Sequence, residues 1–319
     1  MNKKVKEISI KIFLLSALTW GTIETFFQFD PFLKQDLATS YTAAIIDKYA
    51  RLQSLKSPKI VLIAGSNFAY GINSKLIEDS LKKPVVNMAL HYDYGTEFMI
   101  NQVSPELHKG DVVIMGFEYI ISSRGNMSEK ILMSKYFPKA KEWFEYDDIF
   151  QMIGENAQVR VAAFKKMLER IIKNSDISRS IDDTTSVFFR GAINQYGDLV
   201  SHYNNPPMTT IPRAIINDKV SFEKVIINMN AFKAKMDKIG VKVYYTYPPY
   251  AESSYNFDAE IIKKIENQIV KDSKVTILGK PTDFVYPDSL CQDMVYHLTQ
   301  KGAEIRTQKL IELLKKQGF

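Results

Sequence analysis

The chain has few of the residues that form disulfides or bind metal ions. Its 319 residues include one cysteine, Cys291, and four histidines. A single cysteine excludes an internal disulfide, and these residues show no zinc-ligand spacing. A cysteine-poor chain is compatible with an oxidising compartment. We therefore expect no metal and no other cofactor.

The chain also lacks a linker, an internal repeat and a low-complexity tract. With 45% hydrophobic and 12% aromatic residues it can bury one large core, or one core with an insertion. The net charge of +6 raises the question of nucleic acid, but lysines and acidic residues alternate as on solvated helix faces. Because no basic run is interleaved with a stacking platform, we expect no nucleic-acid partner.

A long uninterrupted apolar run is missing as well. The apolar run 12–27 is short and contains Glu24, and no convincing cleavage site follows it. Basic residues precede or begin this run: Lys3, Lys4, Lys6 and Lys11. We expect residues 1–29 to be an uncleaved membrane anchor with the lysines inside and the main domain extracytoplasmic. The alternative, favoured by Lys11 and Glu24, is an amphipathic helix on the protein body or on a membrane surface.

The stretch 59–74, KIVLIAGSNFAYGINS, is the most informative part of the sequence. Five apolar residues, 60–64, predict a central parallel strand buried on both faces. The strand stops at Gly65-Ser66-Asn67, and a capped helical pattern begins near Asn73. Ser66 would therefore stand at the carboxyl edge of the sheet, where open α/β sheets bind their ligands.

The order of the patterned segments predicts an α/β fold. Residues 30–57 are expected to be a helical lead-in, and residues 58–319 one domain. Strands near 60–64, 84–88 and 112–121 alternate with helices near 72–81 and 95–107, which implies right-handed crossovers and a parallel sheet. The pattern loosens over about 122–208, which we interpret as an insertion with helices near 140–150 and 159–172.

Regular alternation returns after the insertion. We expect helices near 221–238, 257–271 and 299–316, and strands at 241–250 and 275–278. Tyrosines in the strand VYYTYPPY favour a place in the core over a sugar-stacking surface.

A base for Ser66 could come from the far end of the domain. Asp293 and His297 lie just before the last helix, for which Thr299 is a plausible N-cap. Loops at the carboxyl ends of parallel strands converge, so Ser66 and His297 can meet although they are distant in sequence. The alternatives are a tight Gly-Ser turn and a structural histidine.

Together these segments resemble the SGNH/GDSL hydrolase superfamily. Ser66 in AGSNFAYG resembles the family's first block, which carries the nucleophile. Gly95 in NMALHYDYG resembles the second block, whose glycine N–H helps to form the oxyanion hole. Asp293 and His297 resemble the last block, which brings the acid and the base together. The resemblance implies a flavodoxin-like doubly wound parallel sheet in a three-layer sandwich. The closest likeness is to membrane-anchored extracytoplasmic members that transfer or remove acyl groups on cell-surface polymers.

Two positions depart from that pattern. Where the family has an asparagine that donates to the oxyanion, this chain has Glu118, which burial could keep protonated or which could point elsewhere. Asp293 lies four residues before His297 instead of three, which makes Asp288 a rival orienting acid.

Several other residues are candidates for the lining of the site. Asn67 adjoins the nucleophile, and Tyr119 adjoins Glu118. The remaining ones are His91 before the second block, and His202 and Asp198 in the insertion. We expect Arg306 to be an exposed ion-pairing residue of the last helix.

The resemblance implies an esterase or O-acyltransferase that acts through an acyl-serine on an acylated carbohydrate of the envelope or of an exported polysaccharide. A membrane-bound acyl-transfer partner would fit the transferase. Two alternatives stay open: an inactive binding or scaffolding protein of the same fold, and a phosphate ligand at Gly65-Ser66.

Overall fold

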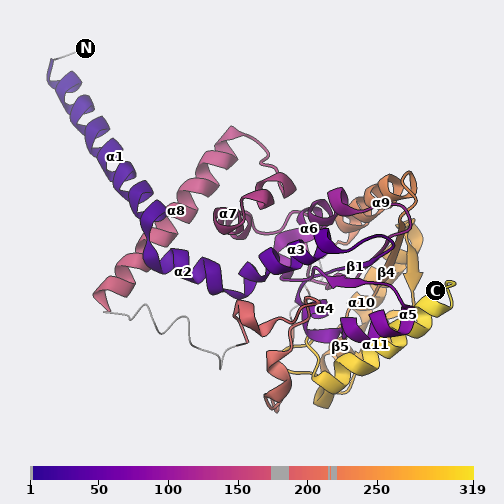
Figure 1. Cartoon of the computed structure of the whole chain (residues 1–319). Coiled ribbons are helices and arrows are strands. Elements are labelled where there is room, and N and C mark those ends of the chain that lie inside the picture. The colour runs from indigo at the N-terminus through magenta and orange to yellow at the C-terminus, as the bar shows by residue number, and fades with distance from the viewer. Residues whose placement is uncertain (1–2, 174–186, 215, 217–220) are drawn as a thin grey trace.

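The computed structural model describes residues 3–173, 187–214, 216 and 221–319. Figure 1 shows a long N-terminal helix that projects from an α/β body. The body contains a five-stranded sheet of order β2-β1-β3-β4-β6, in which every neighbouring pair is parallel. The strands are β1 (Ile60–Ile63), β2 (Val85–Asn87), β3 (Val112–Met115), β4 (Lys242–Thr246) and β6 (Thr276–Leu278).

The strands form within the apolar runs that predict them, but β3 ends at Met115, short of the expected 121, and β4 ends at Thr246, short of the expected 250. Every residue of β1, β2 and β3 is buried, as expected for parallel strands covered by helices on both faces. The first strand lies between β2 and β3, so the chain reverses its direction of winding there. Such a switch point leaves a crevice at the carboxyl ends of the strands.

Helices cover both faces of the sheet (Figure 1). Helix α11 packs on α4 and α5, while α9 packs on α6 and α10. Their bounds are α4 (Ser66–Gly71), α5 (Ser74–Leu81), α6 (Gly95–Val103), α9 (Glu223–Asp237), α10 (Glu252–Asp272) and α11 (Gln300–Lys315). A small second sheet pairs β5 (Tyr250–Ala251) with β7 (Val285–Tyr286). The tyrosines of β4 and β5 are buried, so the preference for the core is confirmed.

Some elements differ from the sequence prediction. Ser66 and Asn67, expected in a turn with Gly65, are the first residues of the short helix α4. Helix α10 begins at Glu252, before the expected start at Phe257. The helix expected near 140–150 does not form as one element. Pro138–Trp143 is a 3₁₀ helix. A new helix begins at Ile149, where the Asp148 side chain accepts from the N–H of Gln151 as its N-cap.

The N-terminal segment is mostly helical, with breaks at Asp30 and Ser40. It comprises α1 (Lys3–Phe29), α2 (Pro31–Thr39) and α3 (Ile45–Ser54). Within α1, described over its whole length, Phe27 is the one buried residue. The segment is long and apolar enough to be a membrane anchor or a signal sequence. A helix that lies on the body would bury far more of its surface.

The insertion packs against the C-terminal end of α1. It contains α7 (Met127–Tyr136) and α8 (Ile149–Ile172), and its residues 174–186 lie outside the described residues. The helix expected at 159–172 is thus the second half of α8. Arg160 of α8 pairs with Glu24, and the rings of Phe26 and Phe164 lie 5.5 Å apart.

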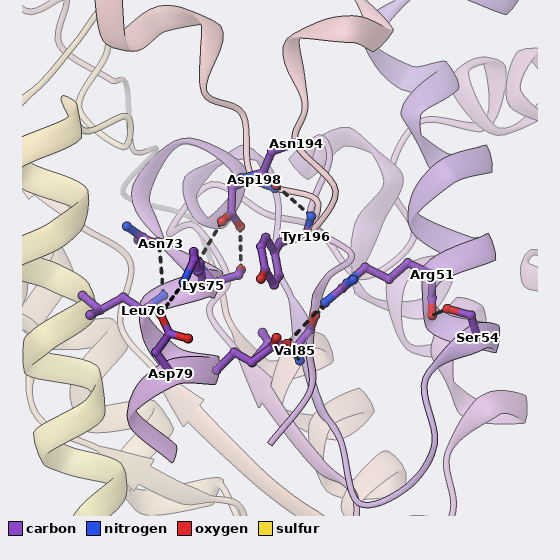
Figure 2. A network of polar contacts seen from close by, with 12 residues as sticks. Arg51, Ser54, Asn73, Lys75, Leu76, Asp79, Val85, Asn194, Tyr196 and Asp198 are labelled. Atoms are coloured by element: carbon purple, nitrogen blue, oxygen red, sulfur yellow. Dashed lines mark hydrogen bonds and ion pairs between the residues drawn. The ribbon is translucent and has the colours of Figure 1, made fainter. Parts of the chain in front are cut away.

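A polar network fastens the end of the insertion to the sheet. Figure 2 shows Asp198 beside the first turn of α5 and Tyr196 beside Arg51. Asp198 accepts hydrogen bonds from the N–H and the hydroxyl of Ser74 at 2.8 and 2.6 Å. Arg51 lies 4.5 Å over the Tyr196 ring. Lys48 donates to the Gly197 carbonyl at 2.5 Å, which joins α3 to the same turn.

Gly95 and Gly125 allow two backbone segments, at 93–95 and 123–125, to pass very close to each other. Gly95 has φ +74°, and a Cβ there would lie 2.5 Å from the backbone of Arg124 and Gly125. The N–H of Thr96 donates to the Ser122 carbonyl at 3.1 Å in the same crossing. Gly95 is therefore required by backbone conformation and packing.

We predict that Gly95→Ala destabilises the protein by about 1–3 kcal/mol, because the new Cβ meets backbone atoms and the conformation is left-handed. Gly154→Ala in α8 is the matched control, since a Cβ there meets nothing within 4 Å. It should stabilise by about 0.5–1 kcal/mol. Urea unfolding of the purified protein measures both, and equal midpoints for the two variants would contradict the prediction.

Candidate active site

The site lies at the switch point of the sheet. Ser66 is the first residue of α4 and follows β1 across a short turn, while Glu118 follows β3. The N–H of Gly116 donates to the Ile63 carbonyl at 3.0 Å, which holds the two loops side by side. Both loops therefore leave the sheet at its carboxyl edge.

The structure brings Ser66, His297 and Asp293 together in one hydrogen-bonded series. The Nε2 of His297 lies 2.8 Å from the Ser66 Oγ, and its Nδ1 lies 2.7 Å from Asp293 Oδ1. Burial opposes the ionised form of Asp293, but its hydrogen bond to His297 and the charge of that ring bring its pKa below the ordinary value. This is the arrangement of a nucleophile, a base and an orienting carboxylate.

The rival acid Asp288 has a different place. Its Oδ1 accepts from the N–H of Ser253 at 3.0 Å. The extra residue between Asp293 and His297 is absorbed by a turn in which the His297 N–H donates to the Met294 carbonyl at 3.1 Å. Thr299 then caps α11 through the Gly302 N–H, as predicted. The capped helix fixes the position of the loop that carries the imidazole.

Tyr70 is a site residue that sequence reasoning missed. Its ring stacks on the His297 imidazole at 3.7 Å with an interplanar angle of 2°. Ser66 and Tyr70 lie four residues apart, so one face of α4 presents both to the same imidazole. Burial raises the pKa of the Tyr70 hydroxyl, which keeps it protonated. The spacing from Ser66 was the one available signal.

His202 stands behind Tyr70. The two rings lie 4.9 Å apart, and the Nε2 of His202 lies 2.9 Å from the Leu298 carbonyl oxygen. His202 is buried, and burial lowers its pKa to about 4. It therefore packs as a neutral ring against Tyr70.

Glu118 anchors the turn that carries Ser66. Its two carboxyl oxygens accept from the N–H groups of Gly65 at 3.2 Å and Asn67 at 3.0 Å, on either side of Ser66. In this structure the carboxyl group of Glu118 is therefore directed at these two N–H groups. The same contacts argue against a phosphate at this turn, since the N–H groups that would hold it already bind a carboxylate.

Arg306 holds the other side of Asn67. Its Nη1 and Nη2 donate to the main-chain oxygen and the Oδ1 of Asn67, both at 2.8 Å. The expected exposed ion pair is wrong, because Arg306 is buried. Burial lowers its pKa to about 10, whereas Tyr286 and Glu118 act in the opposite direction. The guanidinium thus stays charged at neutral pH and faces carbonyl oxygens.

Four other predicted residues lie outside the series. Gly95 donates its N–H to the Tyr92 carbonyl within its own turn, so this structure does not support its oxyanion role. Tyr119 is buried with its ring 5.7 Å from that of Tyr250, and therefore belongs to the core. His91 is half-exposed and accepts from the Asp93 N–H at 3.3 Å. Asp198 belongs to the network of the insertion (Figure 2).

The site is nearly closed and offers no cluster of metal ligands. Ser66 is 6% and His297 is 4% exposed. Over the described ranges, no group of three or more His, Cys, Asp and Glu side chains could hold a metal ion. The hydrogen-bonded series of Ser66, His297 and Asp293 is of the type that supplies proton transfer and attack by a hydroxyl.

We predict that Glu118→Gln destabilises the protein by about 1–3 kcal/mol, because a carboxamide offers one acceptor oxygen for two backbone N–H groups. Glu260→Gln, on the exposed face of α10, is the control and should change stability little. Chemical denaturation compares the two. An unchanged Glu118→Gln midpoint would show that the anchor is dispensable.

The buried His202 predicts acid sensitivity. Its folded pKa of about 4 lies below the ordinary 6.5, so the unfolded chain binds a proton first as the pH falls. The stability that neutral His202 contributes is present above pH 6.5 and is lost as the pH falls toward 4, up to about 3 kcal/mol. In His202→Gln this loss should shrink, whereas His91→Gln should keep it. Urea midpoints at pH 7, 5.5 and 4 test this, and parallel losses in all three proteins would refute it.

Comparison with known proteins adds no relative. A scan against models of protein families and a search of curated proteins both found no match to this chain. The site is therefore defined by its own geometry. It consists of a serine, an imidazole and a carboxylate in hydrogen-bonded series, at the carboxyl edge of a parallel sheet.

Proposed function

We propose that the protein is an SGNH-like serine esterase or O-acyltransferase. The observation that carries the proposal is the series Ser66–His297–Asp293, with distances of 2.8 and 2.7 Å. The strand order β2-β1-β3-β4-β6 supports a flavodoxin-like sheet, in which this site occupies the switch point between β1 and β3. Helices on both faces are consistent with the three-layer sandwich of that superfamily.

The mechanism follows from the order of the three side chains. His297 Nε2 takes the proton of the Ser66 hydroxyl as its Oγ attacks an ester carbonyl carbon. Asp293 holds the Nδ1 proton and stabilises the imidazolium that forms. The tetrahedral intermediate expels the alkoxide, which receives the proton from His297, and an acyl-serine remains. Water or a sugar hydroxyl then repeats the sequence and releases the acyl group.

Negative charge develops on the carbonyl oxygen of the substrate as Ser66 attacks. A hydrogen-bond donor is needed to stabilise it. The N–H of Ser66 is available by position, because the first residue of a helix has no intrahelical acceptor. Glu118 directs its oxygens to the neighbouring N–H groups of Gly65 and Asn67, so its charge is engaged there. A substrate that brings its own hydroxyl next to the oxyanion would supply a second donor.

The proposed substrate is an acyl ester of a cell-envelope or exported polysaccharide. Helix α1 as an anchor, with its lysines on the cytoplasmic side, would hold the main domain outside the cytoplasm. Support for this setting comes from the length and apolar character of α1 and from its exposure. A membrane-bound acyl donor would suit a transferase in that position.

A non-catalytic binding or scaffolding role is the second candidate. Three observations favour it: the site is nearly closed, Glu118 replaces a neutral donor, and the Gly95 N–H is engaged by Tyr92. The two candidates differ in whether an electrophile can react at Ser66.

A fluorophosphonate probe tests the proposal. The intact protein should be labelled at Ser66, and Ser66→Ala should abolish labelling. His297→Ala should slow it by roughly 10³-fold or more, because the hydroxyl loses its base. Asp293→Asn should slow it strongly, whereas the matched control Asp288→Asn should not. Mass spectrometry of the labelled peptide gives the rates.

A folded protein that stays unlabelled, or one that is labelled equally with and without His297, would favour the non-catalytic role. Circular dichroism of each variant establishes that it is folded.

A further inference from the structure

The first turn of α8 is exposed and apolar, and nothing in the proposed reaction uses it. Phe150 is 80% exposed, and its exposed apolar neighbours are Ile149, Met152 and Ile153. Gly154 follows with open space around it. A helix end with four exposed apolar residues is costly in water, and such patches mark interaction sites.

The position of α8 indicates what covers this turn. Helix α8 crosses the C-terminal part of α1; in Figure 1 its first turn points to the same end of the view as the N-terminal half of α1 but diverges from it, while its last turn points the other way. The segment long and apolar enough to cross a membrane, Lys3–Lys34, includes the whole of α1. The exposed turn therefore faces the same side of the molecule as the anchor.

The crossing is a fixed contact. Arg160 pairs with Glu24 and lies 4.8 Å over the Phe27 ring. The Phe26 and Phe164 rings add an apolar contact at 5.5 Å. Since Val159 and Phe27 share a small buried cluster, α8 is packed against both α1 and α7. The first turn of α8 cannot swing freely away from α1.

We propose that the first turn of α8 inserts into the membrane interface beside α1. Apolar helix surfaces bury several ångströms into the boundary between headgroups and acyl chains when a second element holds them there. The anchor supplies that second element, so the turn needs no strong affinity of its own. Two attachment points would fix the orientation of the catalytic domain relative to the bilayer, which a single spanning helix leaves free.

Spin labels on the full-length protein in liposomes of phosphatidylcholine and phosphatidylglycerol test this. The buried Cys291 leaves the parent protein without a reactive thiol. Labels go to Phe150→Cys, to Leu15→Cys in α1, and to Phe257→Cys in α10, where Phe257 is 72% exposed. We expect labels at 150 and 15 to collide more with oxygen than with a water-soluble nickel chelate, and the label at 257 to show the reverse.

A second variant separates insertion from mere proximity. Adding Ile153→Glu should move the label at 150 into water and leave the label at 15 in lipid. A label at 150 that is as accessible to nickel as the one at 257, while 15 stays in lipid, would overturn the proposal. Loss of lipid contact at 15 would overturn it too, because the anchor itself would be absent. None of these readouts depends on catalysis, so they are independent of labelling at Ser66.

Discussion

The site depends on the way in which Asn67 joins two buried charges. Glu118 accepts the Asn67 N–H, while Arg306 binds the Asn67 carbonyl and side-chain oxygens. The Asn67 amide also donates to the Gly116 carbonyl at 2.6 Å. Burying a carboxylate and a guanidinium is costly unless backbone dipoles and an opposite charge compensate each of them. The turn that carries Ser66 provides that compensation, and is held in place as a result.

This arrangement explains why three distant parts of the chain meet at one serine. The loop after β1 carries Ser66, the loop after β3 carries Glu118, and α11 carries Arg306. His297 precedes α11 by only a few residues, so the helix that grips Asn67 also positions the imidazole. Displacing α11 would therefore disturb Ser66 and His297 together. The stacking of Tyr70 on His297 adds a contact from α4 itself.

Much of this could be predicted from local patterns in the sequence. Apolar runs predict the strands, caps such as Thr299 predict helix starts, and the convergence of parallel strands at one edge predicts that Ser66 and His297 meet. The choice of Asp293 over Asp288 needed the turn at Met294, since spacing alone left both open.

The remaining features depend on neighbours that no local pattern identifies. The helical pattern around Arg306 predicts a surface residue. It is buried because α11 packs on α4. Tyr119 reads as a candidate ligand-binding residue until Tyr250 is found against it. Gly95 is required by the approach of residues 123–125, which the sequence places far along the chain. Glu118 was conspicuous, but its orientation depends on two backbone N–H groups of another loop.

The distance along the chain between Ser66 and α11 has a temporal consequence. Ser66 precedes the imidazole that it meets by 231 residues, so during synthesis it emerges well before His297 and Arg306. A chain interrupted between these residues would carry the hydroxyl without the ring that binds it and without the guanidinium that steadies its turn.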